Sequence, residues 1–83
     1  MVKKVYSFQD VKVSVFHPPM VLLNDNEAKR LLSGLVRDGQ SPMAKHPEDF
    51  RLVCLGEFDD NSGLVMSLPT PNFLANAVDY VLN

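Results

Sequence analysis

The chain has 83 residues, of which 46% are hydrophobic and 22% charged, and its formal net charge at pH 7 is −2. This length allows one domain with a thin core, so we expect a single domain over residues 1–83 and no disordered tail. The acidic balance argues against a protein that binds nucleic acid through phosphates alone, because such proteins are usually basic.

The first sixteen residues carry the pattern of two strands. Residues 2–8 combine apolar and basic side chains, and a polar pair at positions 9 and 10 interrupts them. Residues 11–15 then alternate valine with polar side chains, which is the pattern of a strand buried on one face. Residues 2–16 therefore predict a β-hairpin.

A helix is predicted in the middle of the chain. Prolines 18 and 19 end the hairpin, and the apolar residues 20–23 predict either an extended connector over the core or a short edge segment. Over residues 25–38 the apolar side chains recur at helical spacing, with Asn24 placed to cap the first turn. The exposed side of this helix carries a second basic set, Lys29, Arg30 and Arg37. A solvated helix face is the favoured interpretation of that set.

The next segment indicates a turn, a strand and a return. Pro47 fits the first position of a short helical turn. Residues 50–58 are almost unbroken apolar, which is typical of a strand in the middle of a sheet. Residues 59–63, Asp-Asp-Asn-Ser-Gly, favour a tight turn, and residues 64–68 can return antiparallel.

The chain closes with a second predicted helix. Residues 69–71, Pro-Thr-Pro, halt the returning strand, and apolar residues then recur at helical spacing over residues 71–82. The order β-β-α-β-β-α indicates an α+β fold, in which a four-stranded, mainly antiparallel sheet packs two helices on one face. The other face is left to solvent or to a partner, and we expect function there.

No pattern of catalysis or metal binding stands out. The two histidines, His17 and His46, are far apart in sequence, and one cysteine cannot make a zinc site, so we expect no metal and no cofactor. The turn at residues 59–63 lacks the ligand spacing of a calcium loop. Because no nucleophile motif or glycine-rich phosphate loop occurs, we expect no enzyme activity. Cys54 is interpreted as a small buried hydrophobe.

The location of the protein is also constrained. No apolar run approaches the roughly 20 residues that cross a membrane. Residues 6–10 interrupt any signal-peptide core after the two lysines at positions 3 and 4. A lone cysteine forms no internal disulfide and fits a reducing compartment. We therefore expect the protein to stay in the cytoplasm in which it is made.

Binding of single-stranded nucleic acid requires aromatic stacking beside a cationic track. Lysines gather around Tyr6 on the first hairpin, and Arg51 follows on a later strand. Tyr6 is the candidate for stacking on a base, and the cations would lie near phosphates. The candidate nucleic-acid site is Lys3, Lys4, Tyr6, Lys12 and Arg51. The alternative is that Tyr6 and Phe8 belong to the core and the lysines only solubilise a sheet edge.

Surplus apolar residues suggest a competing class, the protein-interaction module. They are Met20, Val21, Leu22, Met43 and Met66. Such residues can cover a dimer seam or dock on another protein, and methionine suits adaptable contacts. The alternative is that they fill one small core.

The most specific stretch of the sequence is HPEDFRLVCLGEFDDNSG at residues 46–63. It resembles a signature, HPEDFxLxxLGEFDxxxG, of the small nonstructural protein of gokushoviruses, which are single-stranded DNA bacteriophages of the microvirus group. The similarity extends over nearly the whole chain. It includes the basic aromatic start at residues 3–6, Asp10, Lys12, the helix at residues 28–35, and Ser41-Pro42.

This resemblance implies a non-enzymatic accessory protein in the cytoplasm of a bacterial host. Members of the family are often described as DNA-binding proteins. The implied role is binding of single-stranded DNA during genome synthesis or packaging. The alternative is a homodimeric adaptor that acts on phage replication or capsid proteins without touching DNA.

Overall fold

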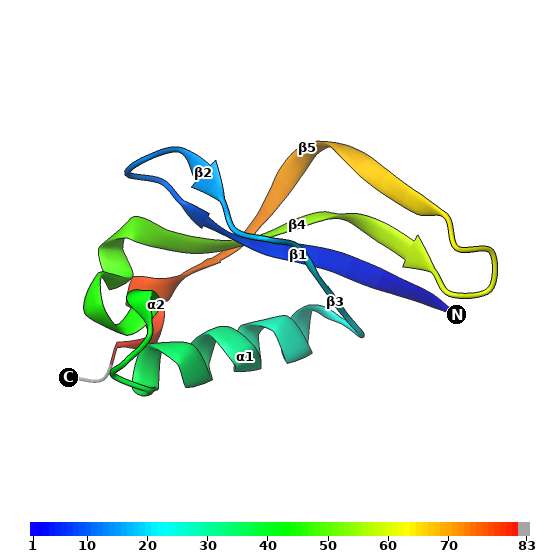
Figure 1. Cartoon of the computed structure of the whole chain (residues 1–83). Coiled ribbons are helices and arrows are strands. Elements are labelled where there is room, and N and C mark those ends of the chain that lie inside the picture. Colours follow the sequence, from blue (N-terminus) through cyan, green and yellow to red (C-terminus); the bar gives the residue numbers. More distant parts are fainter. Residues whose placement is uncertain (82–83) are drawn as a thin grey trace.

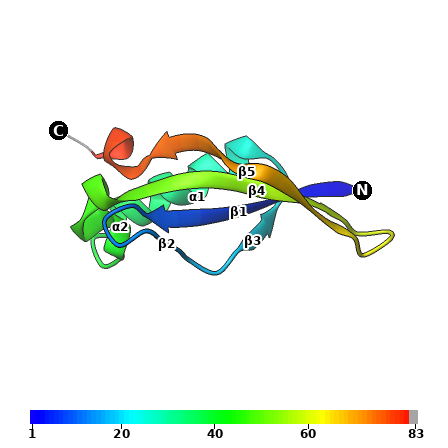
Figure 2. The same ribbon diagram turned by 90° about the horizontal axis from the view of Figure 1, so that it is seen from above.

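Strand β1 (Val2–Asp10) runs through the centre of a curled antiparallel sheet in the computed structural model, which describes residues 1–81 (Figure 1). β4 (Phe50–Asp59) pairs with one side of β1. Two short strands, β2 (Val15–Phe16) and β3 (Met20–Leu22), pair one after the other with its other side. β5 (Val65–Asn76) pairs with β4 and forms the outer edge, as Figure 2 shows from above.

The helices lie against one face of this sheet. Helix α1 (Asp25–Arg37) runs beneath the strands in Figure 1. It begins where the side chain of Asn24 accepts a hydrogen bond from the N–H of Glu27 at 2.9 Å, which supplies the N-cap. The short α2 (Pro42–Lys45) follows near the end of α1. The described residues also contain two 3₁₀ turns, η1 (Pro47–Asp49) before β4 and η2 (Ala77–Tyr80) after β5.

Alternation along the strands gives the sheet two different faces. The register pairs Tyr6 with Cys54 and Phe8 with Leu52, and these four side chains face α1. They form the core together with residues from the helices, the turns and the ends of β4 and β5. Those residues are Ala28, Leu32, Val36, Met43, Phe50, Ala75 and Ala77. We call this side of the sheet the covered face and the opposite side the open face.

The open face is closed only in part. Val5, Ser7 and Val53 belong to it and are buried, although no helix in residues 1–81 packs there. The Ser7 hydroxyl donates to the carbonyl of His17 at 2.7 Å, which ties the segment between β2 and β3 across this part of the sheet. The rest of the open face carries partly exposed side chains.

The structure confirms the α+β class, the helix after Asn24, the strand before residue 59 and the turn at residues 59–63. It also decides one alternative, because residues 20–22 form an edge segment paired with β1. None of the helices in the described part of the chain has the length and apolar composition that a membrane crossing requires.

The predicted strand over residues 11–15 is wrong. Residues 11–14 form a turn, and only Val15 of that range belongs to a strand. The Asp10 carboxylate accepts the N–H of Lys12 at 3.0 Å, and Ser14 adopts a positive φ of 58°. These features bend the chain tightly, so the alternating valines are left exposed.

The predicted helix over residues 71–82 is also wrong. The chain stays extended to Asn76 because β5 supplies the hydrogen-bonding partner that β4 needs along its outer side. Only Ala77–Tyr80 is helical, as a 3₁₀ turn, and residue 82 lies outside the described residues. The second α-helix of the fold is instead α2, in the segment predicted as a connector.

Candidate nucleic-acid interface

Tyr6 belongs to the core. Its side chain is 0% exposed, and its hydroxyl donates to Asp25 Oδ1 at 2.6 Å, at the start of α1. Burial raises the pKa of the Tyr6 hydroxyl, and the bond to Asp25 adds to that rise. The same hydrogen bond lowers the pKa of Asp25. A sealed ring cannot stack on a base, so the prediction that Tyr6 is the stacking residue is corrected.

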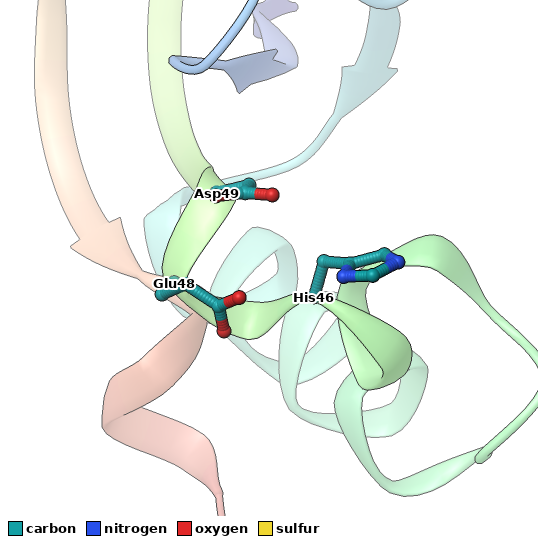
Figure 3. Close-up of side chains that lie close together, drawn as sticks. All are labelled: His46, Glu48 and Asp49. Carbon is teal, nitrogen blue, oxygen red and sulfur yellow. The ribbon is translucent and has the colours of Figure 1, made fainter.

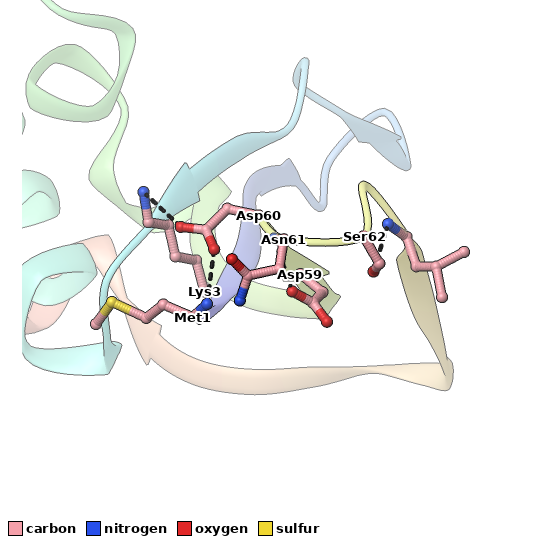
Figure 4. A network of polar contacts seen from close by, with 7 residues as sticks. Met1, Lys3, Asp59, Asp60, Asn61 and Ser62 are labelled. Atoms are coloured by element: carbon pink, nitrogen blue, oxygen red, sulfur yellow. Dashed lines mark hydrogen bonds and ion pairs between the residues drawn. The ribbon is translucent and has the colours of Figure 1, made fainter.

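The two N-terminal lysines are each paired with a carboxylate. Lys4 Nζ lies 3.5 Å from Asp25 Oδ1, on the covered side of the sheet. Lys3 Nζ lies 3.7 Å from Asp60 Oδ2, and the amino group of Met1 lies 2.6 Å from Asp60 Oδ1 (Figure 4). That amino group lowers the pKa of Asp60. Pairing reduces the positive potential that either lysine offers to a phosphate.

Arg51 lies on the open face. Its Nε–H donates to Gln9 Oε1 at 2.7 Å, and its guanidinium carbon lies 5.9 Å from the centre of the Phe73 ring. A cation over an aromatic face is an attractive arrangement. Phe73 itself is 48% exposed. The arginine is therefore oriented by a neutral amide and an aromatic ring, and its other N–H groups can serve a ligand.

A second aromatic residue joins this group. Phe16 of β2 pairs directly with Gln9, and Gln9 pairs with Arg51, so the three side chains share the open face. Phe16 is 41% exposed. Two half-exposed phenylalanines thus flank an arginine and a glutamine. We name Phe16, Gln9, Arg51 and Phe73 the open-face cluster.

Lys12 is exposed in the turn that follows β1, at the same end of the sheet as the open-face cluster. Lys3 is six positions from Gln9 along β1, which corresponds to about 20 Å at the usual rise of a strand. The structure therefore brings Arg51 and Lys12 to one end of the sheet. It separates both from Lys3 and places Lys4 on the other face.

Three members of the cluster were missed by the sequence interpretation. In the sequence, Gln9 belongs to a polar pair that indicates a break, Phe16 follows the predicted strand without a distinctive pattern, and Phe73 lies in the predicted last helix. A signal for Phe73 existed in the strand lengths. A strand of nine residues over positions 50–58 needs a return strand of similar length, and positions 64–68 supply only about half of it.

The surplus apolar residues divide between core and surface. Met43 is buried, whereas Met20 and Leu22 are half-buried against the core. Val21 and Met66 are exposed. Cys54 is buried, as predicted for a small hydrophobe.

Possible metal ligands gather at the turn before β4. The ligand atoms of His46, Glu48 and Asp49 lie within 4.8 Å of one another, and Figure 3 shows the three side chains on the same side of the chain. An imidazole and two carboxylates can bind a divalent cation. All three come from four consecutive residues, with His46 and Glu48 exposed, so most coordination positions would belong to water. We assign no metal to them, because exposed carboxylates commonly gather without one.

The fold and the open-face cluster define a small α+β protein with an exposed cation–aromatic surface on the sheet face that no helix of residues 1–81 covers. The chain belongs to the family described as Phage ORF5 protein, whose family model matches residues 3–80. No curated protein and no solved structure matches it. Family membership confirms the predicted relation to bacteriophages.

Proposed function

We propose that this phage protein is a non-enzymatic accessory protein of the gokushovirus type, which binds single-stranded DNA in the cytoplasm of its bacterial host. The binding would serve genome synthesis or packaging. The observation that supports it is the open-face cluster, in which Arg51 lies over the half-exposed ring of Phe73. The resemblance at residues 46–63 and the family membership supply the phage context.

The chemistry of the cluster suits a single strand. Phe16 and Phe73 offer aromatic surface, and stacking of a base on such a ring contributes about 1–3 kcal/mol. Arg51 offers N–H donors to a phosphate, and the Gln9 amide can both donate and accept hydrogen bonds at a base edge. Lys12 lies at the same end of the sheet as a second cation. Stacking tolerates any base sequence, so binding is expected to be largely independent of sequence.

The acidic total charge sets a further expectation. Few cations are available, so stacking supplies most of the affinity. With one or two phosphate contacts, the logarithm of the affinity falls with the logarithm of salt by a slope of roughly −0.7 to −1.4. A strongly basic protein would show a much steeper slope.

A titration of the protein into a fluorescently labelled oligothymidylate, read by anisotropy at low and moderate salt, tests the proposal. Phe73→Ala is expected to weaken binding roughly tenfold, which corresponds to about 1.4 kcal/mol. Arg51→Gln is expected to weaken binding and flatten the salt slope. Leu31→Ala and Arg30→Gln change exposed positions of α1 and serve as matched controls with unchanged affinity. The proposal is wrong if the wild-type protein does not bind at low salt, or if Phe73→Ala binds as tightly as wild type.

A second candidate function is an adaptor that acts on phage replication or capsid proteins without direct DNA contact. The exposed apolar side chains of Leu64, Val65 and Met66 favour it. Pull-down of a phage replication or capsid protein by a variant that has lost oligonucleotide binding would support this alternative.

A further inference from the structure

Among residues 1–81, no strand pairs with the outer edge of β5 next to the β4–β5 turn, so backbone groups there point to solvent. Asp59 donates its N–H to the carbonyl of Leu64 at 2.9 Å, so Asp59 and Leu64 form a hydrogen-bonded pair at the start of β5. Bonded and non-bonded pairs alternate along an antiparallel ladder. Met66 therefore bonds to β4, whereas Val65 and Ser67 point their N–H and C=O groups away from it. Such an edge is a template for another strand.

An apolar ridge and an apolar groove lie side by side at this edge. Leu64 and Val65 are 60% and 65% exposed and form the ridge. A cavity of about 200 Å³ opens next to it on the open face. It is lined by Val5, Pro19, Leu55, Gly56, Val65, Met66 and Ser67. A surface that offers both a ridge and a groove is self-complementary, as an interface between identical copies requires.

The charge pattern favours a second copy as the occupant. Residues 61–78 contain no charged side chain. Edge strands commonly carry lysine or another charge that repels a second strand. Two copies of this edge can meet without like-charge repulsion. The prolines at positions 69 and 71 lack an N–H and limit the available ladder to residues 65–68.

We propose that the protein forms a homodimer in which residues 65–67 of two copies pair antiparallel about a two-fold axis at Met66, with Val65 of each copy over the groove of the other. This inference goes beyond the proposed DNA binding and does not depend on it. The edge from Leu64 to Leu68 is about 13 Å long at the usual strand rise, and the second principal extent of the molecule is 23 Å. A contact surface with these two dimensions has a smaller area than the roughly 800 Å² per partner of stable complexes. We therefore expect the dimer to form only at micromolar or higher concentration.

Pairing of this kind has a geometric consequence for the open face. A two-fold axis perpendicular to the extended sheet leaves the open faces of both copies on the same side. Each dimer then presents two open-face clusters to one strand of nucleic acid, and linked sites bind with higher avidity than one.

Measurement of the mass in solution by analytical ultracentrifugation, from about 1 µM to 1 mM, tests the dimer. The wild-type mass is expected to rise from 9.3 kDa to twice that value. Val65→Lys is expected to raise the dissociation constant roughly 100-fold, because an isologous interface contains each substitution twice and each contributes about tenfold. Val13→Lys, at a position that is 63% exposed in the β1–β2 turn, is the matched control and leaves the mass unchanged.

A second variant keeps the test informative if the lysine perturbs folding. Ser67→Pro removes an N–H that points away from β4, so it blocks the dimer ladder while the intrachain ladder stays intact. Circular dichroism checks that both variants retain the wild-type fold. The inference is overturned if the wild-type protein is monomeric at every concentration, or if folded Val65→Lys and Ser67→Pro dimerise like wild type. Because the readout is mass, the result does not depend on whether the protein binds DNA.

Discussion

The covered and open faces of the sheet show how a short chain divides its residues between a sealed core and an accessible surface. On the covered face, α1 seals the side chains of Tyr6 and Leu52, and the polar tip of Tyr6 is satisfied by Asp25. On the open face, the segment between β2 and β3 closes only a central part, and Arg51 and Phe73 stay accessible. Strand alternation alone therefore does not decide which side chains are accessible. The element that packs on each face decides which side chains stay accessible.

The largest expected effect comes from a cavity on the covered face. Leu52→Ala is expected to lower the free energy of unfolding by about 2–5 kcal/mol, because Leu52 is fully buried against the helix. Phe73→Ala on the open face should cost less than about 1 kcal/mol, since half of that ring is already in solvent. Urea denaturation followed by circular dichroism measures both. Equal losses would show that the open face is as much a part of the core as the covered face.

A somewhat smaller effect is expected where the two outer strands approach closely. A Cβ added at Gly56 would lie 2.1 Å from the carbonyl oxygen of Met66, so Gly56→Ala forces β4 and β5 apart. We expect a loss of about 1–3 kcal/mol in the free energy of unfolding.

Gly34→Ala is the matched control for Gly56→Ala. A Cβ at Gly34, inside α1, meets nothing within 4 Å, and helix propensity predicts a gain of about 0.5–1 kcal/mol. Thermal unfolding of the two variants side by side should shift the midpoints in opposite directions. An unchanged midpoint for Gly56→Ala would contradict the close approach of β4 and β5 at this position.

A loss smaller than those of Leu52→Ala and Gly56→Ala concerns the polar tip on the covered face. Tyr6→Phe removes the hydrogen bond to Asp25 and is expected to lower the free energy of unfolding by about 1 kcal/mol. A hydrogen bond to a charged group usually contributes more than this, but Asp25 is partly exposed, which reduces the contribution. Chemical denaturation at pH 7 measures the loss.

The same bond makes stability depend on pH. The pKa of Asp25 is lowered from 3.8 in the folded protein, so its contribution is present above pH 3.8 and disappears as the pH falls toward the lower folded value. The pKa of Tyr6 is raised, so its contribution is lost as the pH rises above 10. The difference between wild type and Tyr6→Phe should therefore shrink at both extremes. A constant difference from pH 2 to pH 7 would contradict the assignment to Asp25.

Much of the fold could be predicted from the sequence where local signals agreed with the tertiary context. The cap at Asn24 and the helical spacing after it located α1, and the apolar run before residue 59 located β4. The extended conformation of residues 71–76 could not be predicted in this way. Apolar residues at helical spacing were outweighed by the hydrogen bonds that the outer side of β4 requires, and that need depends on the paired strand rather than on local sequence.

The candidate site was predicted less well than the fold. Arg51 lies on the open face as expected, but the burial of Tyr6 depends on which side of β1 faces α1, and the imperfect alternation of residues 2–8 left that undecided. The contact between Arg51 and Phe73 joins residues on adjacent strands whose register shifts between positions 52 and 53 of β4. An irregularity of this kind leaves no periodic trace in a sequence.

The prolines of β5 have one more consequence. A long, uncharged strand edge can also pair in staggered registers with more than one neighbour, so that molecules add one after another into fibres. The prolines at positions 69 and 71 have no backbone N–H, so the middle of the β5 edge lacks hydrogen-bond donors at these two positions. Replacing both prolines with threonine would lengthen the adhesive edge, and the chain should then polymerise into insoluble aggregates at concentrations where the natural sequence stays clear.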